Sequence, residues 1–203
     1  MDVMEAIQKR RSIRHYKPDD IPDEVLDRLL NAMRLAPSGK NTQPWKFVVV
    51  RDKTTKSKVA AACNWKTADG KLISQNWIDE APVVIVACGS EKEAAVRYYK
   101  RGEVITANWA ALEAEMAQAP IEYESALAFD MAIALDHLTL AARAEGLGTC
   151  WIGGLNEQQM KEILSIPEDV RAPLAVVLGY PVSWPKPTPR KSLDEIVCHD
   201  RYR

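Results

Sequence analysis

The chain has 203 residues, of which 47% are hydrophobic and 27% are charged. That length is enough for one domain with a sizeable core, and the composition is that of an ordinary globular protein. Lys plus Arg (27) nearly balance Asp plus Glu (28), so a net charge of -1 provides no global field to recruit nucleic acid or an anionic membrane. Any anion site must therefore be built locally.

The longest apolar runs, 81–88 and 172–178, have the length of strands, whereas a membrane helix needs about 20 apolar residues. The first helical turns carry charges, so we expect no signal peptide. The four cysteines are scattered and form no CxxC pair, which favours reduced thiols over a disulfide framework. We therefore expect a cytoplasmic protein with no membrane partner.

The hydrophobic patterns predict alternating helices and strands along the chain. In chain order they predict a helix over 2–11, a helix over 23–35, a strand over 45–50, helices over 54–63 and part of 71–80, a strand over 83–88, a helix over 129–144, a short strand over 149–152, a helix from 156, and a strand over 172–178. Asp2 is placed to cap the first helix, in which the apolar Val3, Met4 and Ile7 share a face, and Asn156 is placed to cap the helix that it begins.

The helix over 129–144 has the clearest pattern. Its broad apolar face is rich in alanine, which predicts close approach of another element or subunit, and Gly146 is placed to end it. The segment from 90 to 120 is polar, and we expect it to be mainly helical, covering the site or packing along a dimer partner. The proline-rich tail from 181 should run extended. We expect one domain over 1–203, with 181–203 as an arm.

Several kinds of active site lack their motif in this chain. No GxGxxG follows a predicted strand, and the sequence contains no P-loop and no GxSxG elbow. None of the three histidines has a second ligand at metal spacing, so we expect no metal site. We also identify no catalytic side chain, a pattern typical of enzymes in which a bound cofactor carries the reaction.

Three local constellations remain. In 10–14 (RRSIR), three guanidiniums and a hydroxyl match phosphate oxygens, although on spacing alone an exposed charged helix end is the simpler interpretation. In 36–45 (APSGKNTQPW), a polar loop presents amides to a flat ring or simply joins a helix to a strand. In 146–154 (GLGTCWIGG), glycines allow close backbone approach to a ligand or cap a helix, and Arg190 with Lys191 either closes on an anion or forms an exposed basic tail.

Taken together and in this order, the motifs resemble the nitroreductase family of FMN enzymes over nearly the whole chain. The matching stretches are RRSIRHY, APSGKNTQPWKFVVV, APVVIVAC, DMAIALDHLTLAARAEGLGTCWIGG, LGYP and PRKSLDEIV. The resemblance implies an α+β fold with a mostly antiparallel sheet flanked by helices. It also implies an intertwined homodimer, with the C-terminal arm on the partner and FMN at the subunit interface.

The resemblance also implies roles for individual residues. The cofactor-binding set would be Arg10, Arg11, Ser12 and Arg14 on the phosphate, ribityl chain and pyrimidine edge; Ser38, Gly39, Asn41 and Gln43 from the other subunit; Ile152, Gly153 and Gly154 along the ring; and Arg190 with Lys191 on the phosphate. Residues around 74–76 would approach the pyrimidine side. Family members place a lysine near there, and Trp77 occupies one equivalent position in this chain.

The implied activity is hydride transfer from NADH or NADPH through FMN to a small electron-poor acceptor, such as a nitroaromatic or quinone, in a ping-pong sequence. The alternatives are another activity on the same fold, such as a dehydrogenase or dehalogenase, and a non-catalytic flavin-binding redox sensor. A structural module without cofactor, or a nucleic-acid binder, would match the motifs less well. The sequence alone does not choose between NADH and NADPH or name the acceptor.

Overall fold

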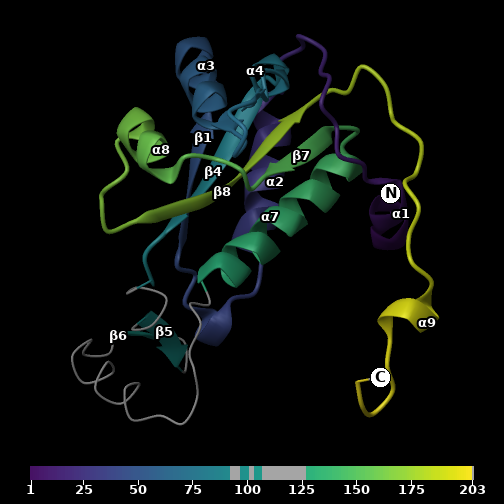
Figure 1. The fold of residues 1–203 in the computed structure, drawn as a ribbon. Coiled ribbons are helices and arrows are strands. Elements are labelled where there is room, and N and C mark those ends of the chain that lie inside the picture. The colour runs from purple at the N-terminus through teal and green to yellow at the C-terminus, as the bar shows by residue number, and fades with distance from the viewer. Residues whose placement is uncertain (92–96, 101–102, 107–126, 203) are drawn as a thin grey trace.

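The computed structural model describes residues 1–91, 97–100, 103–106 and 127–202, and its centre is a four-stranded antiparallel sheet in the order β1-β4-β8-β7 (Figure 1). The elements are α1 (Val3–Lys9), α2 (Asp23–Arg34), η1 (Gly39–Asn41), β1 (Trp45–Val50), α3 (Lys53–Ala62), β2 (Trp65–Lys66), β3 (Leu72–Ile73), α4 (Trp77–Glu80), β4 (Val83–Gly89), β5 (Arg97–Lys100), β6 (Glu103–Thr106), α7 (Leu127–Ala144), β7 (Gly148–Ile152), α8 (Glu157–Leu164), β8 (Arg171–Gly179) and α9 (Leu193–Ile196).

Both faces of the sheet are covered, so every residue of the inner strand β4 is buried. Because successive side chains of a strand point to opposite faces, Val83 and Ile85 pack with α2 and α7, whereas Val84 and Val86 pack with α3, α4 and α8. The predicted α+β fold with an antiparallel sheet between helices is confirmed. No helix among the described residues is long and apolar enough to cross a membrane.

Several local predictions are confirmed in detail. Asp2 caps α1 through the backbone N–H of Glu5 at 2.8 Å, and Asn156 caps α8 through the N–H of Gln159 at 3.0 Å. Gly146 ends α7 with a φ of 81°, the left-handed conformation that glycine adopts without strain. These signals lie within a few residues of each other in sequence, which is why local patterns detect them.

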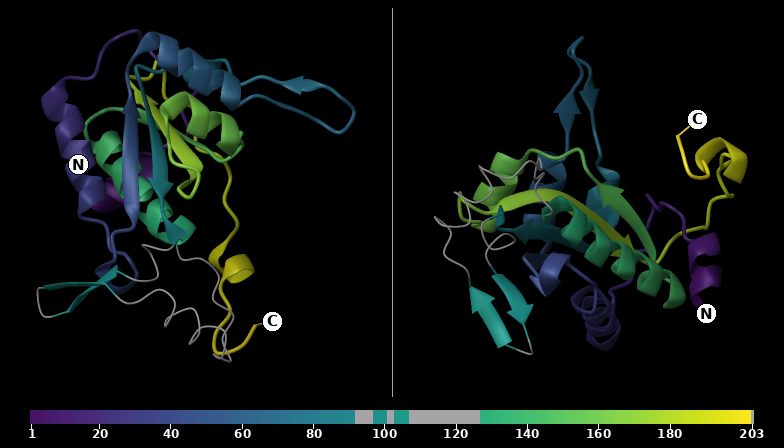
Figure 2. Two further views of the ribbon diagram at one scale, coloured as in Figure 1. Left: turned by 90° about the vertical axis from the view of Figure 1, so that its left-hand side faces the viewer. Right: turned by 90° about the horizontal axis from the view of Figure 1, so that it is seen from below.

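One of the less regular helix predictions is confirmed and the other is wrong. Part of 71–80 is helical as predicted, in the short α4, and just before it β3 pairs with β2 as a two-stranded hairpin that projects from the body (Figure 2). Within 90–120, the described residues form the antiparallel pair β5 and β6 rather than a helix, and the rest of that prediction lies outside the described residues. Strands of two to four residues are too short to show a clear alternation of apolar and polar side chains.

The segment after α1 is fixed to the edge of the sheet. The N–H of Ile13 donates to the carbonyl of Thr149 in β7 at 2.9 Å, and the Tyr16 hydroxyl donates to the Ile13 carbonyl at 2.6 Å. Gly148 makes this approach possible, because a Cβ there would lie 2.4 Å from a side-chain carbon of Ile13. The basic residues on either side of Ile13 are therefore held along β7.

The C-terminal arm begins beside the same segment. The N–H of Lys17 donates to the carbonyl of Tyr180, and the N–H of Val182 donates to the carbonyl of His15. From there the arm runs past α1 and extends away from the body, and α9 is its one regular turn among the described residues (Figures 1 and 2). The extended path predicted for the proline-rich tail agrees with this course.

Candidate cofactor site

A pocket of about 310 Å³ lies between the end of α1 and the C-terminal arm. Five of the eight residues that line it are cationic, and none is acidic. The lining residues are Arg10, Arg11, Ser12, Arg14, Pro185, Lys186, Thr188 and Arg190. Because the net charge of the chain is only -1, a phosphate group can be attracted only by a local cluster of cations. This pocket provides such a cluster.

The pocket lies beside the C-terminus of α1, so an anion that binds there needs the arginines to offset the helix dipole. The carbonyls there carry a partial negative charge, which disfavours a phosphate. Arg11 Nη1 donates to the carbonyls of Gln8 at 2.8 Å and Arg10 at 2.7 Å, and so satisfies that helix end. Its Nε is buried without a hydrogen-bond partner. An unpaired donor of this kind, among cations and hydroxyls, fits an oxyanion such as the FMN phosphate.

Arg14 contacts an aromatic ring next to the pocket. Its guanidinium carbon lies 5.6 Å from the ring centroid of Trp77, at the start of α4. A guanidinium at this distance from an indole is within the range of a cation–π interaction. Trp77 thus contributes to the local electrostatics by holding the Arg14 cation in place.

The arm supplies Arg190 to the pocket, as predicted, and it also supplies Lys186, for which the sequence carries no signal. Lys191, which was predicted beside Arg190, is exposed and is not among the lining residues. Along an extended chain, adjacent side chains point in opposite directions, so a neighbouring pair cannot both be assigned to one pocket from sequence alone. No pattern in the sequence separates Lys186 from the other tail cations.

The predicted glycine turn follows β7. Gly153 and Gly154 are exposed, and a Cβ on Gly153 would meet no atom within 4 Å. Ile152 is 2% exposed and packs in the core, so its side chain is not available to a ligand. The turn is held by Gln75, whose Nε2 donates to the carbonyls of Cys63 at 2.8 Å and Gly154 at 3.3 Å.

The polar loop around η1 has an unusual backbone. Lys40, Asn41 and Gln43 all have φ near +50°, in the left-handed region that non-glycine residues seldom occupy. The Ser38 hydroxyl accepts from the Gln43 N–H at 2.9 Å and so holds the loop closed. Strain of this kind is retained where surrounding structure fixes it, and it concentrates at ligand sites.

The loop around η1 is tied to the first turn of α7. The N–H of Gly39 donates to Oδ1 of Asp130 at 3.1 Å, and Asp130 is only 5% exposed. Burial raises the pKa of the Asp130 carboxyl above its ordinary value, against the lowering effect of the Gly39 hydrogen bond. Asp130 was not identified from the sequence, since its partner lies 91 residues away.

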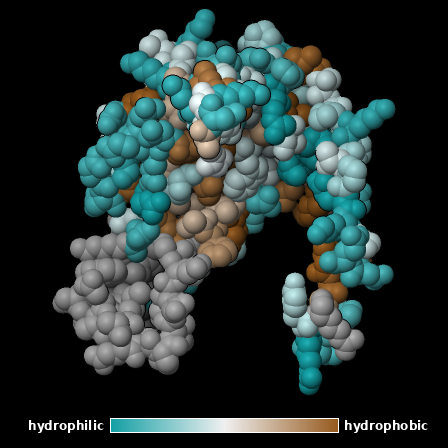
Figure 3. Space-filling model, viewed as in Figure 1, coloured by the Kyte–Doolittle hydropathy of each residue, from teal (hydrophilic) through white to brown (hydrophobic). Residues whose placement is uncertain are grey.

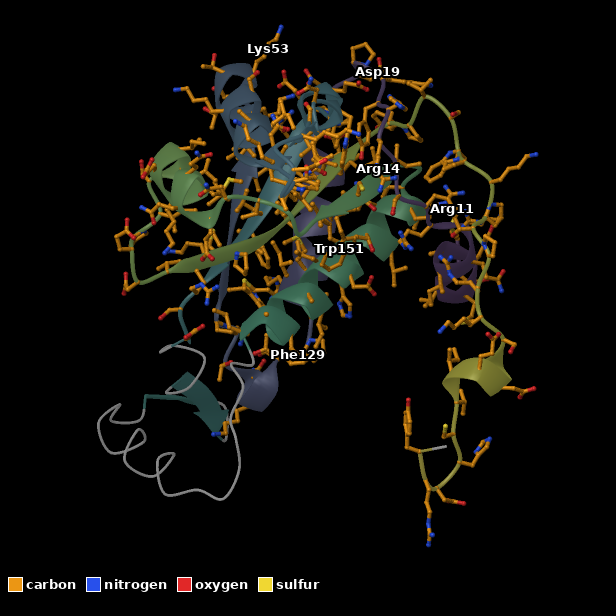
Figure 4. All side chains as sticks on the ribbon, viewed as in Figure 1. Arg11, Arg14, Asp19, Lys53, Phe129 and Trp151 are labelled. Atoms are coloured by element: carbon orange, nitrogen blue, oxygen red, sulfur yellow. The ribbon has the colours of Figure 1, made fainter. Side chains whose placement is uncertain are left out.

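The two parts of the predicted site lie at opposite ends of α7. Asp130 holds the loop around η1 at the start of the helix, and Arg143 contacts the end of α1 near its finish. Thirteen positions of helix span roughly 20 Å at 1.5 Å per residue. Figure 4 shows the same separation, with Phe129 at one end of α7 and Arg11 beside the arm at the other.

The described residues offer little support for a metal site or for a cysteine nucleophile. They contain no group of three or more His, Cys, Asp or Glu side chains arranged to hold a metal ion. The buried thiols are poor nucleophiles, because burial raises the pKa of Cys63 to about 12 and that of Cys88 to about 11. Among the described residues, the basic pocket, the glycine turn and the strained loop are the features that match the ligand contacts expected from the sequence.

The chain is similar to known proteins over most of its length. The model of the nitroreductase family matches residues 7–180. The chain is 33% identical to an NADH dehydrogenase of Thermus thermophilus, over 97% of this chain and 95% of that protein. It is 30% identical to an FMN reductase (NAD(P)H) of Bacillus subtilis, over 99% of this chain and 74% of that one.

Among solved structures, a nitroreductase family protein from Clostridium novyi NT superposes with a TM-score of 0.70 at 30% identity. The superposition covers 89% of this chain and 87% of that one. The residues that the family model matches, 7–180, include the whole central sheet.

The contact between Asp130 and Gly39 generates a pH-dependent prediction. Because the folded carboxyl has a raised pKa, its contribution to stability is present below the ordinary carboxyl pKa and is lost as the pH rises through the raised value. Asp130→Asn removes the charge and keeps an acceptor. At about pH 8, its free energy of unfolding should equal or exceed that of the wild type. At about pH 4, where the wild-type carboxyl is more protonated, the free energy of unfolding of the variant should be lower relative to that of the wild type than it is at about pH 8.

Asp130→Ala serves as the contrast, because it removes the acceptor and should cost about 1 kcal/mol. Urea unfolding of the three proteins at both pH values makes the test. A difference between Asp130→Asn and wild type that stays the same at the two pH values would contradict the role of the buried charge.

Proposed function

This chain belongs to the nitroreductase family, and we propose that it passes electrons from NADH or NADPH, through bound FMN, to a small electron-poor acceptor such as a nitroaromatic or a quinone. It is an NAD(P)H-dependent flavin oxidoreductase. The acceptor, the residues that hold the cofactor and the order of the two half-reactions belong to the proposal. The observation that carries the cofactor site is the cationic pocket between α1 and the arm.

The phosphate of FMN occupies this pocket in our proposal. Arg10 and Arg190 reach it from the two sides, Arg11 offers its unpaired Nε, and Ser12 adds a hydroxyl. Guanidinium groups match phosphate oxygens with two parallel N–H donors, and such charge-assisted bonds are about twice as strong as neutral ones. Lys186 adds a further charge from the arm.

Arg14 lies on the side of the pocket toward α4 and faces the pyrimidine edge of the flavin in this proposal. Bound FMN supplies a ring that accepts a hydride and later releases its electrons to the second substrate. A fixed cation beside that edge stabilises the negative charge that reduction creates. The stacking of Arg14 on Trp77 limits the conformations of that cation before the charge develops.

No side chain of this chain is assigned as a proton donor in the proposed reaction. The exposed turn at Gly153 and Gly154 leaves the ring open to water, so solvent supplies protons to the acceptor. In this proposal both substrates reach the cofactor by the same open side of the site and therefore use it in turn. This sequential use of one pocket is the basis of the proposed ping-pong order.

The proposed assembly is a homodimer with FMN at the interface. The loop around η1 and the cationic pocket lie near opposite ends of α7, where the helix residues that contact them, Asp130 and Arg143, are separated by roughly 20 Å of helix. If both contact one flavin, as the resemblance implies for Ser38, Gly39, Asn41 and Gln43, the loop must come from a second copy. A dimer brings the two parts together without any change in the fold of either chain.

Exposed apolar side chains favour the same assembly. The apolar face predicted for α1 does not pack in the core of this chain, and α9 on the extended arm exposes Leu193 and Ile196 by 72% and 61%. Phe129 and Ile133 are exposed on α7. Figure 3 shows brown, apolar surface on the arm and near α7, on the sides that face each other. A second copy of the chain would cover these surfaces.

The phosphate assignment is tested by Arg10→Gln and Arg190→Gln. Each change removes a charge-assisted bond, so the dissociation constant for FMN should rise on the order of 10- to 100-fold. Riboflavin, which lacks the phosphate, should bind these variants as it binds the wild type. Fluorescence quenching of flavin on apoprotein measures both ligands. Arg34→Gln is the matched control, because Arg34 is exposed and bonds only locally to Asn31 among the contacts described. Unchanged FMN affinity in both pocket variants would defeat the assignment.

The dimer is tested on the arm with the double variant Leu193→Asp and Ile196→Asp. Two charges on the apolar side of α9 should weaken the subunit contact, so sedimentation should show a larger monomer fraction at micromolar concentration. The far-ultraviolet circular dichroism spectrum should not change, because neither residue packs in the core. A wild-type chain that sediments as a monomer would refute the proposed assembly.

A further inference from the structure

Arg143 lies outside the pocket and contacts both segments that form it. It stands in the last turn of α7, where its Nε donates to the carbonyl of Lys9 at 3.2 Å. Its guanidinium carbon lies 3.9 Å from the ring centroid of Trp184. Lys9 directly precedes Arg10, and Trp184 directly precedes Pro185. One side chain therefore links the start of the basic segment with the part of the arm that enters the pocket.

Few described hydrogen bonds fix the arm to the body of the protein. Its backbone pairs with the body at Val182, whose N–H donates to the carbonyl of His15, and residues 182–192 are all exposed. The Arg190 guanidinium donates locally, to the carbonyls of Thr188 and Pro189. An exposed chain of this kind loses conformational entropy when it is ordered, so a fixed contact near its start matters for where Arg190 lies.

The chemistry of the contact suits this task. A guanidinium stacked on an indole keeps its N–H donors in the plane of the group, so Arg143 can hold the ring and the Lys9 carbonyl at the same time. Trp184 is 38% exposed, which leaves its other side in contact with water rather than with the core. The ring is therefore held mainly by the cation, and the contact can be removed without opening the interior.

We propose that Arg143 and Trp184 form a latch that keeps the arm over the end of α1 and thereby sets the affinity of the pocket for the FMN phosphate. Both are positioning residues, since neither lines the pocket. The inference rests on the proposed placement of the phosphate in this pocket, and it adds two residues that the pocket itself does not reveal. The latch acts on the phosphate end of the cofactor and leaves the ring end unaffected.

The test measures flavin binding rather than turnover. Trp184→Ala should raise the dissociation constant for FMN by roughly 3- to 30-fold, the range that corresponds to one partly desolvated cation–π contact. Trp184→Phe keeps an aromatic face and should stay within about threefold of wild type. Riboflavin affinity should be the same in all of these proteins, because riboflavin has no phosphate to report on the position of the arm.

Variants of the arginine complete a double-mutant cycle. Arg143→Gln should weaken FMN binding at least as much as Trp184→Ala does, because it also removes the hydrogen bond to the Lys9 carbonyl, and the double variant should bind FMN no more weakly than Arg143→Gln alone. Arg143→Lys keeps the cation and should recover part of the loss. Arg28→Gln is the matched control: Arg28 bonds to Glu145, near the same end of α7, through Nε at 2.8 Å, and it lines neither the pocket nor the latch. It should bind FMN like the wild type.

The possible results separate the latch from the proposed function. FMN affinity unchanged in Trp184→Ala, or FMN and riboflavin weakened equally, would overturn the latch. Additive losses in the double variant would also overturn it, because the two residues would then act independently. A wild-type protein that binds FMN no more tightly than riboflavin would remove the phosphate from the pocket, and the latch and the site assignment would both be wrong.

Discussion

Five cationic side chains converge on one pocket, and like charges at such spacing repel one another unless an anion lies between them. The local structure of this part of the chain resists that repulsion. Backbone hydrogen bonds hold the basic segment to β7, the buried Tyr16 hydroxyl closes the turn after Ile13, and the arm pairs with the same segment. The sheet thus serves as the rigid edge on which a positively charged site is assembled.

The long helix α7 connects this site with the rest of the proposed assembly. Its first turn carries Asp130, which fixes the loop around η1, and its last turn carries Arg143, which fixes both segments of the pocket. The helix also packs against α2 and the sheet, so both ends are held by one core. If two chains pair as we propose, the two ends of α7 hold parts of two different flavin sites.

Sequence predicted well whatever depends on neighbours in the chain. The central strands, the amphipathic helices and the caps at Asp2, Asn156 and Gly146 were all evident, and the order of motifs identified the family. The hairpin of β2 and β3 was missed because strands of two residues carry no periodicity. The exposure of the apolar face of α1 was missed because a sequence pattern shows that a face is apolar and does not show what covers it.

The site was predicted in outline for the same reason. Clusters such as 10–14 are visible in sequence, whereas Lys186, Asp130 and Arg143 gain their roles from residues far away in the chain. The resemblance implied roles for Lys191 and Ile152, but Lys191 does not line the pocket and the side chain of Ile152 packs in the core. Tertiary contacts of this kind have no local signature.

The most direct test of the central claim is an anaerobic titration of the purified, FMN-loaded protein with NADH and with NADPH, followed in the visible spectrum. The account predicts that at least one donor bleaches the flavin band and that a nitroaromatic or quinone, added after the donor is consumed, restores it. That result would show two half-reactions that proceed separately in one site. A protein that takes up no FMN, or a bound flavin that neither nicotinamide reduces, would contradict the account.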